Sequence, residues 1–157
     1  MFKHGLLRTT LALITLLTAC GRVLPATTAP QPLPSPGEAW TIKLTQSGGF
    51  AGVHLTVEVS SNGQLKAEDQ RSGRTVLQNL SPASMTELNR LFSKALAATA
   101  APPRSGCADC FIYDLEVTSA GNTSAIRVDD TTLEASGAAE LITVLRQLRD
   151  RALKSAP

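Results

Sequence analysis

Cys107 and Cys110, separated by two residues in "CADC", are the side chains whose type and spacing most directly suggest chemistry. A Cys-x-x-Cys pair can catalyse disulfide exchange when the pKa of one thiol is lowered, commonly by a helix N-terminus. Here Cys110 is followed at once by "FIYDLEV", an alternating pattern typical of a strand, so that activating helix is missing. We therefore favour a structural disulfide between Cys107 and Cys110 over a redox-active pair.

The other reactive side chains offer no second reaction centre. Of the 2 histidines only His54 remains after removal of the predicted signal, and it lies in an alternating strand pattern, which argues against a Ser-His-Asp triad. A zinc site is not expected either, because a closed site needs four ligands and the two cysteines of "CADC" have no histidine nearby. Asp129 and Asp130 are adjacent, so in a strand they point to opposite faces, and a solvated strand end explains them. We predict no catalytic residues, no metal, no cofactor and no small-molecule substrate, and thus a protein that is not an enzyme.

The N-terminal segment predicts export and lipidation. Residues 1–19 combine Lys3 and Arg8 with a short apolar run, which is typical of a signal peptide. The run "LTAC", residues 17–20, resembles the lipobox of bacterial lipoproteins, in which the cysteine, here Cys20, is lipidated on sulfur and acylated at its new N-terminus. The alternative is ordinary cleavage after an alanine with Cys20 left as a free thiol, which is less favoured because a lone exported thiol is a liability. We expect a protein anchored to a membrane of the bacterial cell envelope, outside the cytoplasm.

Residues 20–38 read as the lipidated cysteine and a proline-rich tether, which reaches roughly 50 Å at about 3.1 Å per residue when extended. The whole chain has 15 Lys and Arg against 13 Asp and Glu, and loss of Lys3 and Arg8 leaves 13 of each. Since no basic field remains, we predict no binding to nucleic acid.

Residues 39–157 predict one α+β domain. Strand-like alternation covers Trp40–Thr45 and Val53–Ser60, and Asn62-Gly63 predicts a tight turn into a third strand, "QLKAEDQ". The short run "RTVLQNL" is expected to pair weakly. A helical stripe then runs from Met85 to Ala95, starting at Ser81 before Pro82 or at Ser84.

The second half repeats strands and then a helix. "FIYDLEV" and "AIRVDD" alternate around the turn "SAGNTS", and a final amphipathic helix is predicted from near Ser136. Its cations Arg146, Arg149 and Arg151 are explained by the helix dipole and solubility. The fold class is therefore α+β: an antiparallel sheet of four to five strands with two helices packed on one face, in the order ββ(β)-α-ββ-α.

The segment "SGGFAG" between the first two strands is the strongest candidate for a binding element. It comprises Ser47, Gly48, Gly49, Phe50, Ala51 and Gly52. Glycines allow unusual backbone conformations and close approach by another chain, and an aromatic side chain at a loop tip can anchor a partner. The alternative, that Phe50 folds back into the core while the glycines form a bulge, is equally consistent with these residues.

Two motifs together resemble the emfourin family of bacterial protealysin inhibitors. These are "SGGFAG" directly after a strand and "DCFIYDLEV", in which Asp109, Phe111 and Tyr113 have the family's spacing. The resemblance covers most of the folded domain and implies inhibition of a thermolysin-like zinc metalloprotease, secreted or in the envelope, by occupation of its active-site cleft. It places Ser47–Gly52 at the contact, with Cys107–Cys110 as a second candidate and Asp109, Phe111 and Tyr113 in structural roles.

The chain departs from a simple soluble inhibitor in its lipobox, its tether and the cysteines around Asp109. A second hypothesis is therefore an envelope lipoprotein that acts as a protein-interaction module without inhibiting anything.

Overall fold

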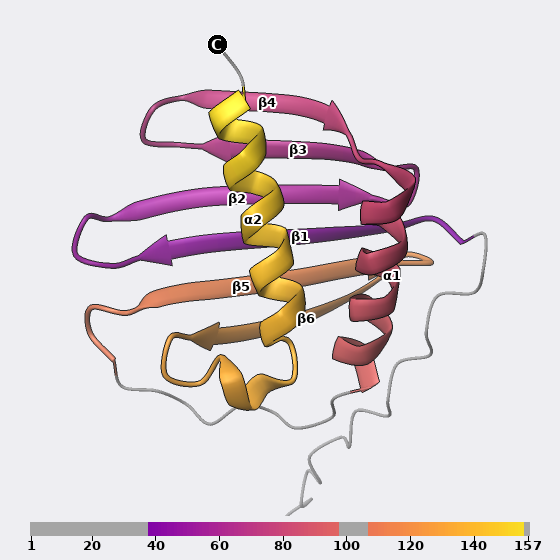
Figure 1. The fold of residues 1–157 in the computed structure, drawn as a ribbon. Coiled ribbons are helices and arrows are strands. Elements are labelled where there is room, and N and C mark those ends of the chain that lie inside the picture. The colour runs from indigo at the N-terminus through magenta and orange to yellow at the C-terminus, as the bar shows by residue number, and fades with distance from the viewer. Residues whose placement is uncertain (1–37, 98–106, 156–157) are drawn as a thin grey trace, which may run out of the picture.

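The computed structural model describes residues 38–97 and 107–155, which form a six-stranded antiparallel sheet with two helices on one face (Figure 1). The strand order is β4-β3-β2-β1-β5-β6. The elements are β1 (Trp40–Gly48), β2 (Val53–Ser60), β3 (Gln64–Asp69), β4 (Arg74–Asn79), α1 (Pro82–Ala97), β5 (Phe111–Ser119), β6 (Asn122–Asp129), the 3₁₀ helix η1 (Glu134–Ser136) and α2 (Ala139–Ser155). The signal and tether predicted for residues 1–38 lie almost wholly outside the described residues.

The predicted α+β class is confirmed, with six strands rather than four to five. The additional strand is β4, the run that we expected to pair only weakly. It pairs with β3 along its whole length, from Gln64 opposite Asn79 to Asp69 opposite Arg74. Asp69 stabilises the connecting turn, because its Oδ1 accepts a hydrogen bond from the Arg71 N–H at 3.0 Å.

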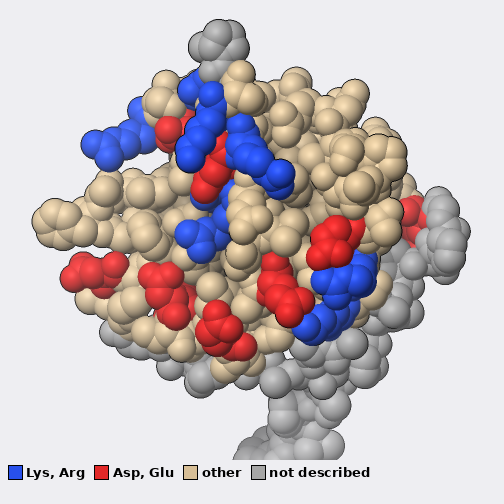
Figure 2. Space-filling view, viewed as in Figure 1, with Lys and Arg blue, Asp and Glu red and all other residues tan. Residues whose placement is uncertain are grey.

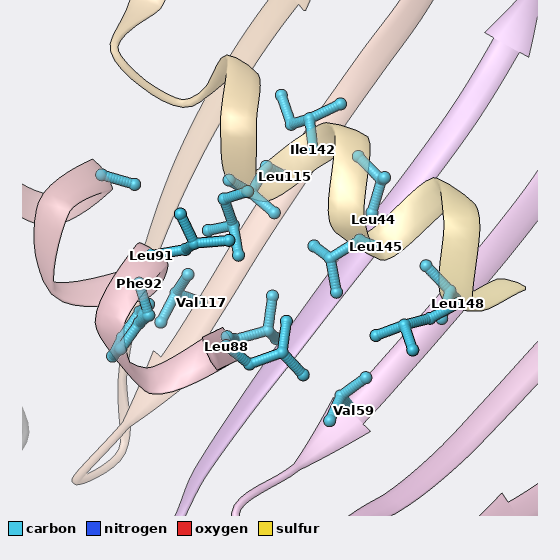
Figure 3. Packing of buried hydrophobic residues seen from close by; sticks show 14 of the residues in the cluster. Leu44, Val59, Leu88, Leu91, Phe92, Leu115, Val117, Ile142, Leu145 and Leu148 are labelled. Carbon is cyan, nitrogen blue, oxygen red and sulfur yellow. The ribbon is translucent and has the colours of Figure 1, made fainter. Parts of the chain in front are cut away.

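The core lies between the sheet and the two helices (Figure 3). Alternate residues of β1, β2 and β5 point to it, including Leu44, Val59 and Leu115, and α2 contributes Leu145 and Leu148. The opposite face carries Lys43 between its cross-strand neighbours Glu58 and Glu116. Apolar residues at every second strand position thus direct both helices to one face.

The helix starts follow local hydrogen bonds. Ser81 precedes Pro82, and its Oγ accepts a hydrogen bond from the Ser84 N–H at 3.2 Å, so α1 begins at the first of the two predicted sites. The predicted start of α2 near Ser136 is wrong by three residues. Gly137 adopts a left-handed φ of 71° and ends η1, so α2 begins at Ala139. Neither helix of the described residues is long and apolar enough to span a bilayer.

Candidate functional site

The candidate contact is the turn between β1 and β2, formed by Gly48–Gly52. The Gly52 N–H donates to the Gly49 carbonyl oxygen at 3.0 Å, which closes a β-turn with Phe50 and Ala51 at its tip. Gly48, Gly49 and Gly52 have φ of 86°, 69° and 59°, a region that favours glycine. The Phe50 side chain is 100% exposed. The alternative in which Phe50 plugs the core is therefore wrong.

This turn rests directly on the first residues of β5. The Gly49 N–H donates to the Cys110 carbonyl oxygen at 3.2 Å. A Cβ atom on Gly48 would lie 2.8 Å from that same oxygen, and one on Gly49 would lie 2.5 Å from a ring carbon of Phe111. The two glycines are thus required by the close approach of another segment as well as by their φ angles.

The second predicted contact segment lies at the same end of the sheet. Gly48 is the cross-strand partner of Phe111, so the β1–β2 turn and the residues before β5 lie side by side (Figure 1). The predicted disulfide between Cys107 and Cys110 is confirmed, with the two Cα atoms 5.6 Å apart. Asp109, within this ring, is exposed. The sequence predicted both segments, and the structure brings them together.

Asp130 also contributes to this end of the sheet, through contacts that its position in the sequence does not indicate. Its Oδ2 accepts a hydrogen bond from the Phe111 N–H at 2.9 Å, and its Oδ1 accepts one from the Tyr113 hydroxyl at 2.9 Å. Asp129 has a separate role, because its Oδ1 accepts hydrogen bonds from Thr131 and Thr132 and shapes the turn after β6. Both aspartates lie at the solvated end of β6, as predicted, and in addition each one holds a neighbouring segment by hydrogen bonds.

Tyr113 is buried behind the turn among polar side chains of α2 and β1. Arg146 lies over its ring, with the guanidinium carbon 5.2 Å from the ring centre, and Gln46 is its cross-strand partner. Burial, and next the hydrogen bond to Asp130, raise the pKa of Tyr113 above its ordinary value of 10.0. Arg149 is only 2% exposed and forms an ion pair with Asp150 at 2.8 Å, so solubility does not explain this arginine.

The charges on the helix-bearing face are unevenly distributed. Lys and Arg gather mainly over the C-terminal part of α2, whereas most Asp and Glu lie across the lower half of this face (Figure 2). Within residues 38–97 and 107–155, no three His, Cys, Asp or Glu side chains gather as a group that could hold a metal ion. At the β1–β2 turn the described side chains offer an apolar tip, Phe50, on a backbone fixed by hydrogen bonds. Such an arrangement is suited to binding a partner.

Comparison with known proteins gives one assignment. The Emfourin family model matches residues 44–146. No curated protein matches the chain. The matched range begins inside β1 and ends inside α2, and it contains both the β1–β2 turn and the start of β5. Since the match covers more than half of the chain, this protein belongs to the emfourin family.

Proposed function

We propose that this protein inhibits a thermolysin-like zinc metalloprotease and that its β1–β2 turn enters the active-site cleft. Membership of the emfourin family, a family of metalloprotease inhibitors, supports an inhibitory role. The observation that carries the choice of contact is the fully exposed Phe50 side chain at the tip of a glycine-fixed turn. A solvent-exposed aromatic side chain gains hydrophobic free energy only when a partner covers it.

The mechanism requires no chemistry from the inhibitor. A zinc protease must admit an extended chain to its metal and its activated water, so a loop that fills the cleft blocks substrate. Hydrogen bonds from Gly52 to Gly49 and from Gly49 to Cys110 hold the turn in one conformation before binding. This preorganisation lowers the entropy lost on association.

Inhibition of a thermolysin-like protease by the full-length protein, purified in detergent, tests this proposal. Phe50→Ala should weaken inhibition roughly 30-fold, since loss of a buried aromatic anchor costs about 2 kcal/mol. Leu77→Ala is the matched control, because Leu77 on β4 is the other large apolar side chain that is exposed among residues 38–97 and 107–155. Absence of inhibition by the wild type would refute the function for this enzyme class, and equal effects of the two variants would refute the assigned contact.

The alternative function is an envelope lipoprotein that recruits a partner without inhibition. The cysteines on either side of the exposed Asp109 favour it, because their disulfide is a departure from a simple soluble inhibitor. Binding of a non-protease partner that survives Phe50→Ala would support this alternative.

The proposed location is a membrane of the bacterial cell envelope, reached by export and lipidation of Cys20. The lipobox-like residues 17–20 and the proline-rich segment after them support this part of the proposal. A tethered inhibitor would act on proteases that reach the cell surface.

A further inference from the structure

We propose that Asp130 is a positioning residue for the β1–β2 turn, acting through a single peptide group of the neighbouring strand. Its consequence for inhibition rests on the function proposed above, whereas its effect on the turn does not. The contact turn itself contains no hydrogen bond to Asp130, so the effect has to pass through the first residues of β5.

The peptide group between Cys110 and Phe111 connects the two. Its N–H, on Phe111, donates to Asp130 Oδ2 at 2.9 Å, and its carbonyl oxygen, on Cys110, accepts from the Gly49 N–H at 3.2 Å. A trans peptide group is planar and rigid, and its N–H and C=O point in opposite directions. Fixing the N–H therefore fixes the direction of the carbonyl oxygen that holds Gly49.

The hydrogen bonds also strengthen one another electronically. A carboxylate that accepts from the N–H polarises the peptide group and makes its carbonyl oxygen a better acceptor. The two hydrogen bonds form a chain that runs from the Asp130 carboxylate through the Cys110–Phe111 peptide group to the Gly49 N–H, and Gly49 directly precedes Phe50.

Asp130 is itself held from both sides. Its second oxygen, Oδ1, accepts the Tyr113 hydroxyl at 2.9 Å, and Tyr113 is 1% exposed, so this donor has little freedom to move. On the main chain, Asp130 follows directly after Asp129, whose carboxylate accepts hydrogen bonds from Thr131 and Thr132. The carboxylate thus presents a fixed acceptor to the start of β5.

The test compares hydrogen exchange at the Gly49 amide and protease inhibition in the full-length protein. Asp130→Ala removes the acceptor of both the Phe111 N–H and the Tyr113 hydroxyl. It should raise the Gly49 exchange rate about tenfold, the effect of losing the Gly49 hydrogen bond to Cys110, and weaken inhibition by a similar factor. Amides in the middle of β1 and in α2 should keep their wild-type rates. Asp130→Asn should restore most of the protection, because its amide oxygen can accept from Phe111 while its amide nitrogen donates to the Tyr113 hydroxyl.

Glu134→Ala is the matched control, because it removes another exposed acid from the same connection before α2. It should change neither measurement. Unchanged Gly49 exchange in Asp130→Ala would overturn the inference, as would an equal rise at amides throughout the sheet. The exchange measurement needs no protease, so a wild-type protein that fails to inhibit would refute the proposed function and leave this test decisive.

Discussion

Gly49 and Gly52 bound the same turn but have different surroundings. Both have positive φ, which an alanine adopts at a cost of about 1 kcal/mol. A Cβ on Gly49 would also lie 2.5 Å from the Phe111 ring, whereas one on Gly52 would meet nothing within 4 Å. We expect Gly49→Ala to lower the free energy of unfolding by about 2–3 kcal/mol and Gly52→Ala by about 1 kcal/mol.

Urea unfolding of the two variants measures this difference. Equal losses of stability would show that the Phe111 ring moves away from a Cβ without cost, which would contradict the close packing between the turn and β5.

The raised pKa of Tyr113 should make the free energy of unfolding depend on pH in the alkaline range. Burial and the hydrogen bond to Asp130 raise its pKa in the folded state, so the protonated form is favoured there. This contribution to stability is complete below the ordinary pKa of 10.0 and is lost as pH rises through the folded-state pKa. The urea midpoint of the wild type should therefore fall above about pH 10, relative to Tyr113→Phe. Parallel pH profiles for the two proteins would refute this role of Tyr113.

The orientation of Phe50 and the contacts of Asp130 could not be predicted from the sequence. "SGGFAG" indicated a special segment, but an exposed Phe50 and a core plug require the same glycines. Only the folded structure, in which the Phe50 side chain is 100% exposed, excludes the second arrangement. Asp130 escaped prediction because its partners, Phe111 and Tyr113, are 19 and 17 residues away and meet it only through the pairing of β5 and β6.

At the level of elements, periodicity predicted most of the sheet and both helices. Alternation found β1, β2, β5 and β6 because one face of each strand is buried. It underestimated β4 because two of its half-buried positions, Arg74 and Gln78, are polar whereas the apolar Leu77 is exposed. The start of α2 was misplaced because Ser136 is a good N-cap residue, and only the left-handed Gly137 reveals a separate 3₁₀ turn.

The disulfide ring before β5 is expected to matter more for inhibition than for folding. Cys107 and Cys110 are separated by 3 positions, and closing so short a loop stabilises a fold by only about 2 kcal/mol on the chain-entropy model. Changing both cysteines to serine should therefore leave the domain folded, as seen by circular dichroism, with a modest loss of stability. Inhibition should weaken, because without the ring the backbone carbonyl of residue 110, which accepts the Gly49 N–H, is held less firmly in place.

Full inhibition by the double-serine variant would show that the ring is dispensable for the contact. Global unfolding would instead show that the ring contributes more than loop closure to the sheet.

For the whole molecule, the proposed tether and the proposed contact turn are joined to opposite ends of β1. The chain enters the domain at Trp40 and reaches the contact turn after Gly48, so strand geometry separates the two by roughly 30 Å. The contact turn thus lies at the opposite end of β1 from the residue that the proposed tether would join. If the domain is tethered as proposed, its contact turn is presented at the end of β1 that is remote from the membrane attachment.

Cys20→Ser tests the anchor. The wild-type protein should fractionate with membranes and the variant should be recovered in the soluble fraction, because the serine cannot carry the thioether-linked lipid. Recovery of both proteins in the soluble fraction would contradict lipid anchoring while leaving the inhibitory function open to its own test.

The central position of β1 also has a mechanical consequence. A partner that grips the Phe50 turn while the tether holds Trp40 would stretch the domain along this one strand. β1 is bonded on both sides, to β2 and to β5, in antiparallel registers that cover nearly its whole length. A pull between the two ends of this one strand is carried by its covalent backbone, which is already nearly fully extended, so we expect the domain to withstand the drag of a captured protease without sliding of its strands.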